Sequence, residues 1–239
     1  MNWLNPCKFI AHHLQSVLFP STCVLCHSPT SRSFDICSAC ECDLPRLSSR
    51  CVICAAPLHV DTEQCCGACL HEPPPFDHTI ALWQYDFPTN KLILDLKFHA
   101  KLVNARIISE LFIKQLQRHY EKKNMPECII PVPLHKKRLH ERGFNQAIEI
   151  AKPIAKQCKI PLEITLCHRT RATQAQSSLP AKKRQQNIKG AFDLTRPCEY
   201  KHIAILDDVV TTGHTIREMC RGLKKAGVER IEVWCVART

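Results

Sequence analysis

The sequence predicts an α/β domain with a parallel sheet, preceded by a cysteine-rich module that binds zinc. In residues 76–239, short apolar runs typical of buried strands alternate with segments of helical periodicity, a pattern typical of parallel sheets. In residues 21–72, four C-x-x-C pairs stand among few apolar residues, so that a metal would supply much of the folding free energy. Three prolines at 73–75 indicate a stiff linker between the two parts.

The length and charge of the chain limit its class of function. At 239 residues the chain can form one good core and a small accessory module. Its formal net charge of +11 favours phosphorylated or polyanionic ligands, and two zinc ions on eight thiolates would lower it to about +7. The N-terminal stretch lacks the unbroken apolar core of a signal peptide, and no apolar run is long enough for a transmembrane helix. We therefore expect a cytoplasmic protein with reduced thiols and no membrane span.

Residues 1–20 are expected to form an N-terminal helix. Apolar side chains recur on one helical face between residues 8 and 18, namely Phe9, Ile10, Leu14, Val17 and Leu18. Such a helix would pack on its own protein or, in the alternative, bind a membrane surface.

The C-x-x-C pairs are the strongest metal signal in the chain. A C-x-x-C turn aims two thiolates at one point, and a tetrahedral zinc needs two such turns. Pairing in sequence order predicts two structural zinc sites, one with Cys23, Cys26, Cys37 and Cys40 and one with Cys51, Cys54, Cys66 and Cys69. Crossed pairing, Cys65 in place of Cys66, or a single zinc with one degenerate pair also fit the spacing. A redox role for the pairs is the competing function.

Strands and helices are expected to alternate in the second part of the chain. Strands are predicted at 79–85, 128–133, near 162–166, and at 191–194, 201–206 and 230–237. Helices are predicted from Leu92 onward and over 102–120, 145–157 and 216–226, because apolar residues recur there on one face. Segment 134–144 is expected to be a loop. The long polar segment 168–190 is expected to be a functional lid or disordered.

The stretch AILDDVVTTGHT at 204–215 gives the first indication of chemistry. An apolar strand is followed by Asp207 and Asp208, then by small hydroxyl residues and Gly213, and then by a helix. A helix N-terminus holds phosphate well because its N–H groups and its dipole face the ligand. The two carboxylates suit vicinal hydroxyl groups, as an acidic residue does for ribose in dinucleotide sites. These residues predict a cradle for a phosphorylated ribose; the alternative is a strand-loop-helix corner with an acidic cap.

Cationic side chains are concentrated in two other segments. Segment 134–146 follows a strand and carries four cations within seven positions, and ligand sites of parallel sheets lie at such strand ends. Segment 168–190 is also polar and basic. We expect these side chains to contact phosphate groups of a small ligand or of a nucleic acid; the alternative is a solvated charged face. The candidates are Lys136, Lys137, Arg138, Arg142, Gln146, Arg169, Arg171 and Arg184.

The acidic stretch resembles the loop of type I phosphoribosyltransferases that binds 5-phosphoribosyl 1-pyrophosphate (PRPP), and nearly the whole chain resembles the ComF family. The matching features are the four C-x-x-C pairs, PPPF, LKF, PVPLHKKRLHERGFNQA, RTRATQAQ…KRQQNIKGAF and DDVVTTGHT. The resemblance implies a type I phosphoribosyltransferase-like domain after a zinc module. It also implies that Asp207 and Asp208 are catalytic and hold the ribose 2′- and 3′-hydroxyls. The other PRPP-binding residues it implies are Lys97 for pyrophosphate and Val210, Thr211, Thr212, Gly213, His214 and Thr215 for the 5′-phosphate.

Three functions fit this resemblance. The ComF family is associated with natural transformation (competence), in which its members handle incoming single-stranded DNA on the cytoplasmic side. The chain is expected to be an adaptor for single-stranded DNA, a protein that binds PRPP without turnover, or a phosphoribosyltransferase that uses PRPP with Mg²⁺ and an unknown acceptor. Expected partners are PRPP or a related phosphorylated ribose, single-stranded DNA, and other DNA-uptake or recombination proteins. Many relatives carry a glycine where this chain has Ala100, three residues after Lys97.

Overall fold

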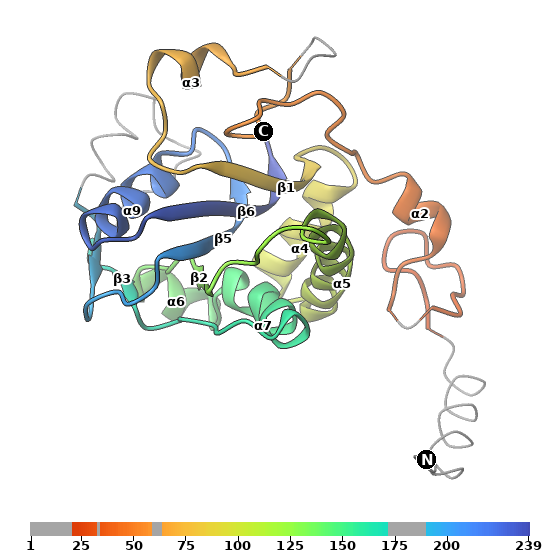
Figure 1. The fold of residues 1–239 in the computed structure, drawn as a ribbon. Coiled ribbons are helices and arrows are strands. Elements are labelled where there is room, and N and C mark those ends of the chain that lie inside the picture. Colours follow the sequence, from red (N-terminus) through yellow and green to blue (C-terminus); the bar gives the residue numbers. More distant parts are fainter. Residues whose placement is uncertain (1–20, 33, 59–63, 172–189) are drawn as a thin grey trace, which may run out of the picture. The chain divides into compact units, whose positions relative to one another are not determined.

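A four-stranded parallel sheet forms the centre of the fold (Figure 1). We obtained a computed structural model that describes residues 21–32, 34–58, 64–171 and 190–239. The strand order is β1-β6-β5-β2, with β1 at His78–Gln84, β2 at Cys128–Pro131, β5 at His202–Val210 and β6 at Arg230–Arg238. The two central strands, β5 and β6, are long and almost entirely buried, as the apolar runs predict. The expected α/β fold with a parallel sheet is therefore confirmed.

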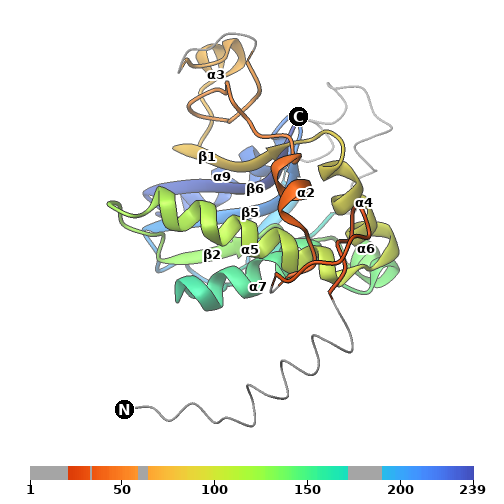
Figure 2. The same cartoon turned by 90° about the vertical axis from the view of Figure 1, so that its right-hand side faces the viewer.

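Helices cover both faces of this sheet, because successive strand residues point to opposite sides. Ile203 and Ile205 of β5 pack in one core cluster with Met219 and Leu223 of α9. On the other side, Trp234 of β6 contacts the ring of Phe112 in α5, and Figures 1 and 2 both show α5 beside α7. In the described part of the chain, the helices after β1 are α4 (Thr89–His99), α5 (Leu102–His119), α6 (Lys136–Arg142), α7 (Gln146–Cys158) and α9 (His214–Lys225).

Three expected elements differ in the structure. Strand β5 continues through Val210 because β6 runs beside it to Arg238, so the two aspartates lie inside the strand and not after it. The strand expected near 162–166 is a single bridge between Leu162 and Ile129. A short antiparallel pair lies nearby instead, formed by β3 (Cys167–Arg169) and β4 (Phe192–Leu194).

The third difference is α6, which replaces the loop expected over 134–144. The side chain of His135 accepts a hydrogen bond from the backbone N–H of Lys137 and so caps the helix start. Gly143 ends the helix with φ of +80°, a left-handed conformation that glycine adopts without strain. The cationic run therefore has helical periodicity, which decides where each side chain points.

By contacts, the chain divides between Leu44 and Pro45 into two compact units. The first two cysteine pairs and the short helix α2 (Ser38–Cys42) belong to the first unit. The last two pairs and α3 (Gly67–His71) belong to the same unit as the sheet, because Leu47 and Ala55 pack into its core. This boundary lies inside the 21–72 module that the sequence pattern predicts.

Some expectations fall outside the described residues. The helix over 1–20, residue Arg184 and most of the 168–190 segment are among them. None of the described helices is long and apolar enough to cross a membrane.

Candidate ligand-binding site

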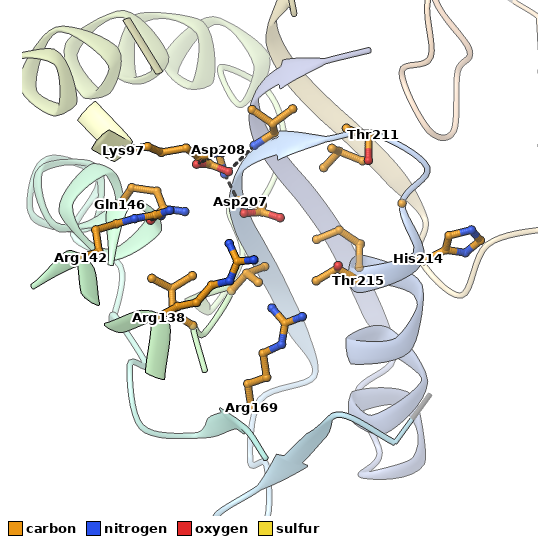
Figure 3. Close-up of a pocket in the computed structure, with 16 residues that line it drawn as sticks. Lys97, Arg138, Arg142, Gln146, Arg169, Asp207, Asp208, Thr211, His214 and Thr215 are labelled. Carbon is orange, nitrogen blue, oxygen red and sulfur yellow. Dashed lines mark hydrogen bonds and ion pairs between the residues drawn. The ribbon is translucent and has the colours of Figure 1, made fainter. Parts of the chain in front are cut away.

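A pocket of about 180 Å³ lies at the carboxyl ends of β2 and β5, beside the N-terminus of α9 (Figure 3). Ligand sites of open parallel sheets occur at this edge. The polar lining residues are Lys97, Arg138, Arg142, Gln146, Arg169, Asp207, Asp208, Thr211, His214 and Thr215. Val132, Leu134, Val209, Val210, Gly213 and Ile216 complete the wall.

The two aspartates occupy the centre of this pocket (Figure 3). The backbone N–H of Asp208 donates to Oδ1 of Asp207 at 2.9 Å, and the N–H of Val209 donates to Oδ1 of Asp208 at 2.7 Å. Asp208 is buried, and its Oδ2 lies 2.7 Å from Nζ of Lys97 in the last turn of α4. Both carboxylates are thus held in place from the strand, and among the described residues Asp208 is the member of the pair that lies at ion-pair distance from a lysine.

Burial and the charge of Asp208 both change the pKa of the Asp207 carboxyl group. Desolvation, followed by repulsion from Asp208, raises the pKa of Asp207 to about 8. The acidic pair without a ligand therefore holds a proton at neutral pH. Hydroxyl groups that donate to these oxygens would favour the ionised form, so the pair is suited to bind vicinal hydroxyls.

Three arginines lie on one side of the acidic pair in Figure 3. Arg138 and Arg142 are four residues apart on α6 and so share one helix face. Arg142 donates to Oε1 of Gln146 and lies over the ring of Phe98. Burial lowers the pKa of Arg142, but an arginine keeps its charge at any physiological pH.

Arg169 approaches the pocket from β3. Its guanidinium lies over the ring of Phe192 on β4, 5.5 Å from the ring centroid. Burial also lowers its pKa, and the repulsion from Arg138 adds to this effect. Together with Lys97, the pocket gathers four cationic side chains around two carboxyl groups. This excess of positive charge favours a ligand with several negative charges.

The opposite wall is the turn from β5 into α9. Gly213 precedes α9 with φ of +74°, and a side chain at this position would be strained by the backbone conformation. Thr211, His214 and Thr215 line the pocket from this turn and the first residues of α9. The first N–H groups of a helix have no partner within the helix, so they are suited to hold a phosphate.

The structure brings most of the expected site residues to one place. The residues that do not line the pocket are Thr212, Lys136, Lys137 and Arg171. Lys136 and Lys137 are exposed and lie away from the face of α6 that carries Arg138 and Arg142. Four residues of the apolar wall were not predicted from the sequence, namely Val132, Leu134, Val209 and Ile216, although Val132 and Leu134 follow β2 within the PVPL motif. Ala100 ends α4 in the left-handed conformation, with φ of +50°, which explains why glycine suits this position.

The cysteines form two clusters with the geometry that zinc requires. In each of the two sets Cys23, Cys26, Cys37, Cys40 and Cys51, Cys54, Cys66, Cys69, all sulfur atoms lie within 4.8 Å of one another. The sulfurs of Cys26 and Cys37 are 3.7 Å apart, and those of Cys54 and Cys66 are 3.6 Å apart. A tetrahedral zinc with Zn–S bonds of about 2.3 Å separates its sulfurs by about 3.8 Å. The sulfur atoms group in sequence order, with Cys66 and not Cys65 in the second cluster, and zinc binding by these eight cysteines stays a prediction.

Comparisons with known proteins agree with both parts of the fold. Residues 145–239 match the family described as phosphoribosyl transferase domain, and residues 14–70 match the double zinc ribbon domain. The DNA utilization protein YhgH of Escherichia coli is 34% identical over 223 residues, which are 92% of this chain and 98% of that protein. Competence protein F of Haemophilus influenzae is 36% identical over 73% of this chain and 79% of its own length. Competence protein ComFC of Bacillus subtilis is 24% identical over 86% of this chain and 89% of its own length.

Proposed function

This chain belongs to the ComF family, and we propose that it binds PRPP in the pocket around Asp207 and Asp208 and handles incoming single-stranded DNA during natural transformation. One observation supports the first half above all others. The acidic pair of β5 lies between the glycine-containing turn into α9 and a group of cationic side chains. A phosphorylated ribose with a second anionic group needs these three features together.

The chemistry of the pocket assigns a part of PRPP to each wall. The vicinal ribose hydroxyls would donate to the carboxylates of Asp207 and Asp208, and the 5′-phosphate would lie against the turn from Val210 to Thr215. The pyrophosphate would then face Lys97 and the arginines of α6. Mg²⁺ takes oxygen ligands, usually carboxylates together with substrate phosphates, so the acidic pair and the pyrophosphate fit this ion.

Turnover of PRPP is the alternative within the same pocket. A nucleophile would form a bond to the anomeric carbon of the ribose while the bond from that carbon to the pyrophosphate oxygen breaks. The cationic side chains would stabilise the negative charge that develops on the departing pyrophosphate. Arg138 and Arg142 lie on the side of the acidic pair away from the turn into α9, which is the side that the proposal assigns to the pyrophosphate.

The role in DNA handling is inferred from the names of the relatives and from charge. Relatives that match most of the chain are named for DNA utilization and for competence. The net charge of +11 favours a polyanion, and Lys136 and Lys137 are exposed on α6 away from its pocket face. Because zinc thiolates need reduced cysteines, we propose a cytoplasmic location.

The proposal is tested by calorimetric titration of the zinc-loaded protein with PRPP and Mg²⁺. The double variant Asp207→Asn/Asp208→Asn should abolish binding while the protein stays folded. Asp43→Asn/Asp193→Asn is the matched control, because it makes the same two substitutions at exposed positions outside the pocket. Equal PRPP affinity in the two double variants would overturn the ribose role. A parallel titration with single-stranded DNA, with and without PRPP, tests the proposed role in DNA handling.

A further inference from the structure

We infer that the second cysteine cluster holds the turn from β5 into α9 in its binding conformation, and that Arg238 is the positioning residue that links the two. Arg238 is buried near the end of β6, and it does not line the pocket. The inference deepens the proposed function, since the turn it concerns is the one assigned to the 5′-phosphate of PRPP. It assigns to the zinc ion of the second cluster a role beyond folding the segment that carries this cluster, residues 51–72, which we call the second ribbon.

The guanidinium of Arg238 joins three segments that are distant in sequence. Its Nε donates to the carbonyl oxygen of Cys54 at 2.9 Å. One terminal nitrogen donates to the carbonyl oxygen of Val210 at 2.9 Å, and also to that of Thr211 and, at 2.7 Å, to that of Thr239. The other terminal nitrogen lies 4.0 Å from the sulfur of Cys54. One side chain therefore holds both the first residues of the phosphate turn and a ligand of the second cluster.

The charge of Arg238 also points to the cluster. A buried guanidinium needs a nearby negative charge or a full set of acceptors. Within the described ranges, no aspartate or glutamate forms an ion pair with Arg238. Four backbone oxygens accept hydrogen bonds from Arg238, and the sulfur of Cys54 lies 4.0 Å from its other terminal nitrogen. A zinc ion with four thiolates carries a net charge of about −2 and would add a negative charge beside the guanidinium. A zinc-loaded cluster thus supplies both the carbonyl and the charge that keep Arg238 in place.

A second contact ties the same ribbon to the other end of the turn. Glu72 follows α3, the helix that carries Cys69 of the cluster. Its carbonyl oxygen accepts a hydrogen bond at 3.0 Å from Arg217, which lies in the first turn of α9, and its carboxylate accepts one from Arg221 at 3.3 Å. The ribbon therefore contacts the chain both before and after Gly213. Displacement of the ribbon would move the N–H groups that face the phosphate.

Small displacements matter because phosphate binding depends on several N–H groups pointing at one place. A shift of about 1 Å in a positioned group is enough to weaken binding or catalysis strongly. The first cluster belongs to the other compact unit and shares no residue with this network. It is an internal control that the chain itself provides.

The test compares four variants by zinc content and by hydrogen exchange of residues 210–215 in the absence of PRPP. Cys54→Ser should lose one zinc and raise exchange in the turn at least about tenfold. Arg238→Met should retain two zinc ions and raise exchange at the same residues, which separates the link from folding of the ribbon. Arg238→Lys, which keeps the charge but loses the fork of donors, should fall between wild type and Arg238→Met. Cys26→Ser should lose one zinc from the first cluster with unchanged exchange in the turn.

PRPP affinity supplies the second readout. Arg238→Met should weaken PRPP binding about tenfold or more while exchange in the core of β5, over 203–206, stays as slow as in the wild type. Unchanged exchange at 210–215 in Arg238→Met, or equal loosening in Cys26→Ser, would overturn the inference. Absence of PRPP binding in the wild-type protein would instead overturn the proposed function, and the exchange data would still decide the role of Arg238.

Discussion

Nζ of Lys97 lies 2.7 Å from Oδ2 of Asp208, so that the last turn of α4 is tied to the acidic pair of β5. Asp208 is almost completely buried, and a buried carboxylate is tolerated only with a partner of opposite charge or with hydrogen-bond donors. The lysine therefore has two roles in the pocket. It compensates Asp208 in the absence of ligand, and in the proposed complex it would offer a positive charge to the pyrophosphate of PRPP.

Replacement of Lys97 by methionine should weaken PRPP binding about 10- to 100-fold, since a hydrogen bond to a charged group contributes about 1.5–3 kcal/mol. Lys101→Met is the matched control, because Lys101 is an exposed lysine of the same segment that pairs with Asp95 outside the pocket. Calorimetric titration with PRPP and Mg²⁺ measures both. Equal losses in the two variants would mean that only general charge matters at this edge of the sheet.

The pKa of Asp207 predicts a stability that depends on pH. Burial and Asp208 raise this pKa from 3.8 to about 8, so in this window the folded protein keeps a proton that the unfolded chain releases. The free energy of unfolding should therefore fall as pH rises from about 4 to about 8, by at most ~1.4 kcal/mol per pH unit for one proton. Asp207→Asn removes this titration. The variant should gain stability relative to wild type as pH rises, as measured by urea unfolding.

The control for this experiment is Asp193→Asn, an exposed aspartate outside the pocket, whose unfolding should follow the wild-type pH dependence. If wild type and Asp207→Asn lose stability in parallel with pH, Asp207 does not carry the proton.

The same titration bears on ligand affinity. PRPP that binds through ionised carboxylates should bind more tightly at about pH 8 than at about pH 6.

The two neighbouring cysteines of the second cluster offer a sharp test of the metal sites. Wild-type protein should contain two zinc ions per chain, one for each cluster. Cys66→Ser should lose one of them because the Cys66 sulfur lies in the second cluster. Cys65→Ser should keep both, since the Cys65 sulfur does not belong to the set. Zinc content measured by atomic absorption decides the matter, and loss of metal in Cys65→Ser would contradict the assignment.

A buried acidic residue on β6 makes a prediction about stability that is independent of the ligand site. Glu232 is fully buried and accepts a hydrogen bond from the hydroxyl of Tyr120, while Nε2 of His202 and a guanidinium nitrogen of Arg230 lie 2.8 and 2.9 Å from its other oxygen. Burial and this hydrogen bond raise the pKa of Tyr120, so the hydroxyl stays protonated and donates. Tyr120→Phe should reduce the free energy of unfolding by about 1–3 kcal/mol.

Urea unfolding of Tyr120→Phe and of Tyr85→Phe measures this contribution. Tyr85 directly follows β1, and in the described part of the chain no hydrogen bond of its hydroxyl is found, so its variant should change stability by less than about 0.5 kcal/mol. A Tyr120→Phe variant as stable as the control would show that the remaining partners of Glu232 compensate for the lost hydroxyl.

Much of the fold could be predicted because the local signals agree with the tertiary structure. The buried runs of β5 and β6 and the apolar face of α9 lie where their periodicity indicates. The strand near 162–166 and the loop at 134–144 were wrong for two different reasons. Leu162 bridges to Ile129 only because the chain passes the edge strand there, and the helicity of α6 depends on a cap by His135 that no periodicity reveals.

The ligand-binding residues of the candidate site could be predicted from the sequence, but the contacts that join this site to the second cysteine cluster could not. Asp207, Asp208 and the turn into α9 are contiguous in sequence, so their motif alone indicates a ligand. Arg238 is separated from Cys54 by 184 residues, and its contact with that cysteine follows from the packing of the second ribbon on the sheet. Long-range contacts of this kind leave no pattern in the spacing of residues.

The two faces of α6 predict that small-ligand binding and DNA binding can be separated. Arg138 and Arg142 line the pocket, whereas Lys136 and Lys137 are exposed on another face of the same helix. Arg142→Ala should weaken PRPP binding about 10- to 100-fold because it removes a charged partner of the ligand. Lys136→Ala/Lys137→Ala should keep PRPP affinity, weaken binding of single-stranded DNA, and lower the salt dependence of DNA binding by about one to two ions.

Calorimetry with PRPP and fluorescence anisotropy with labelled DNA at several salt concentrations measure both effects. If the double lysine variant loses PRPP affinity as Arg142→Ala does, the helix acts as one undivided basic surface; an unchanged salt dependence would place the DNA contact elsewhere on the chain.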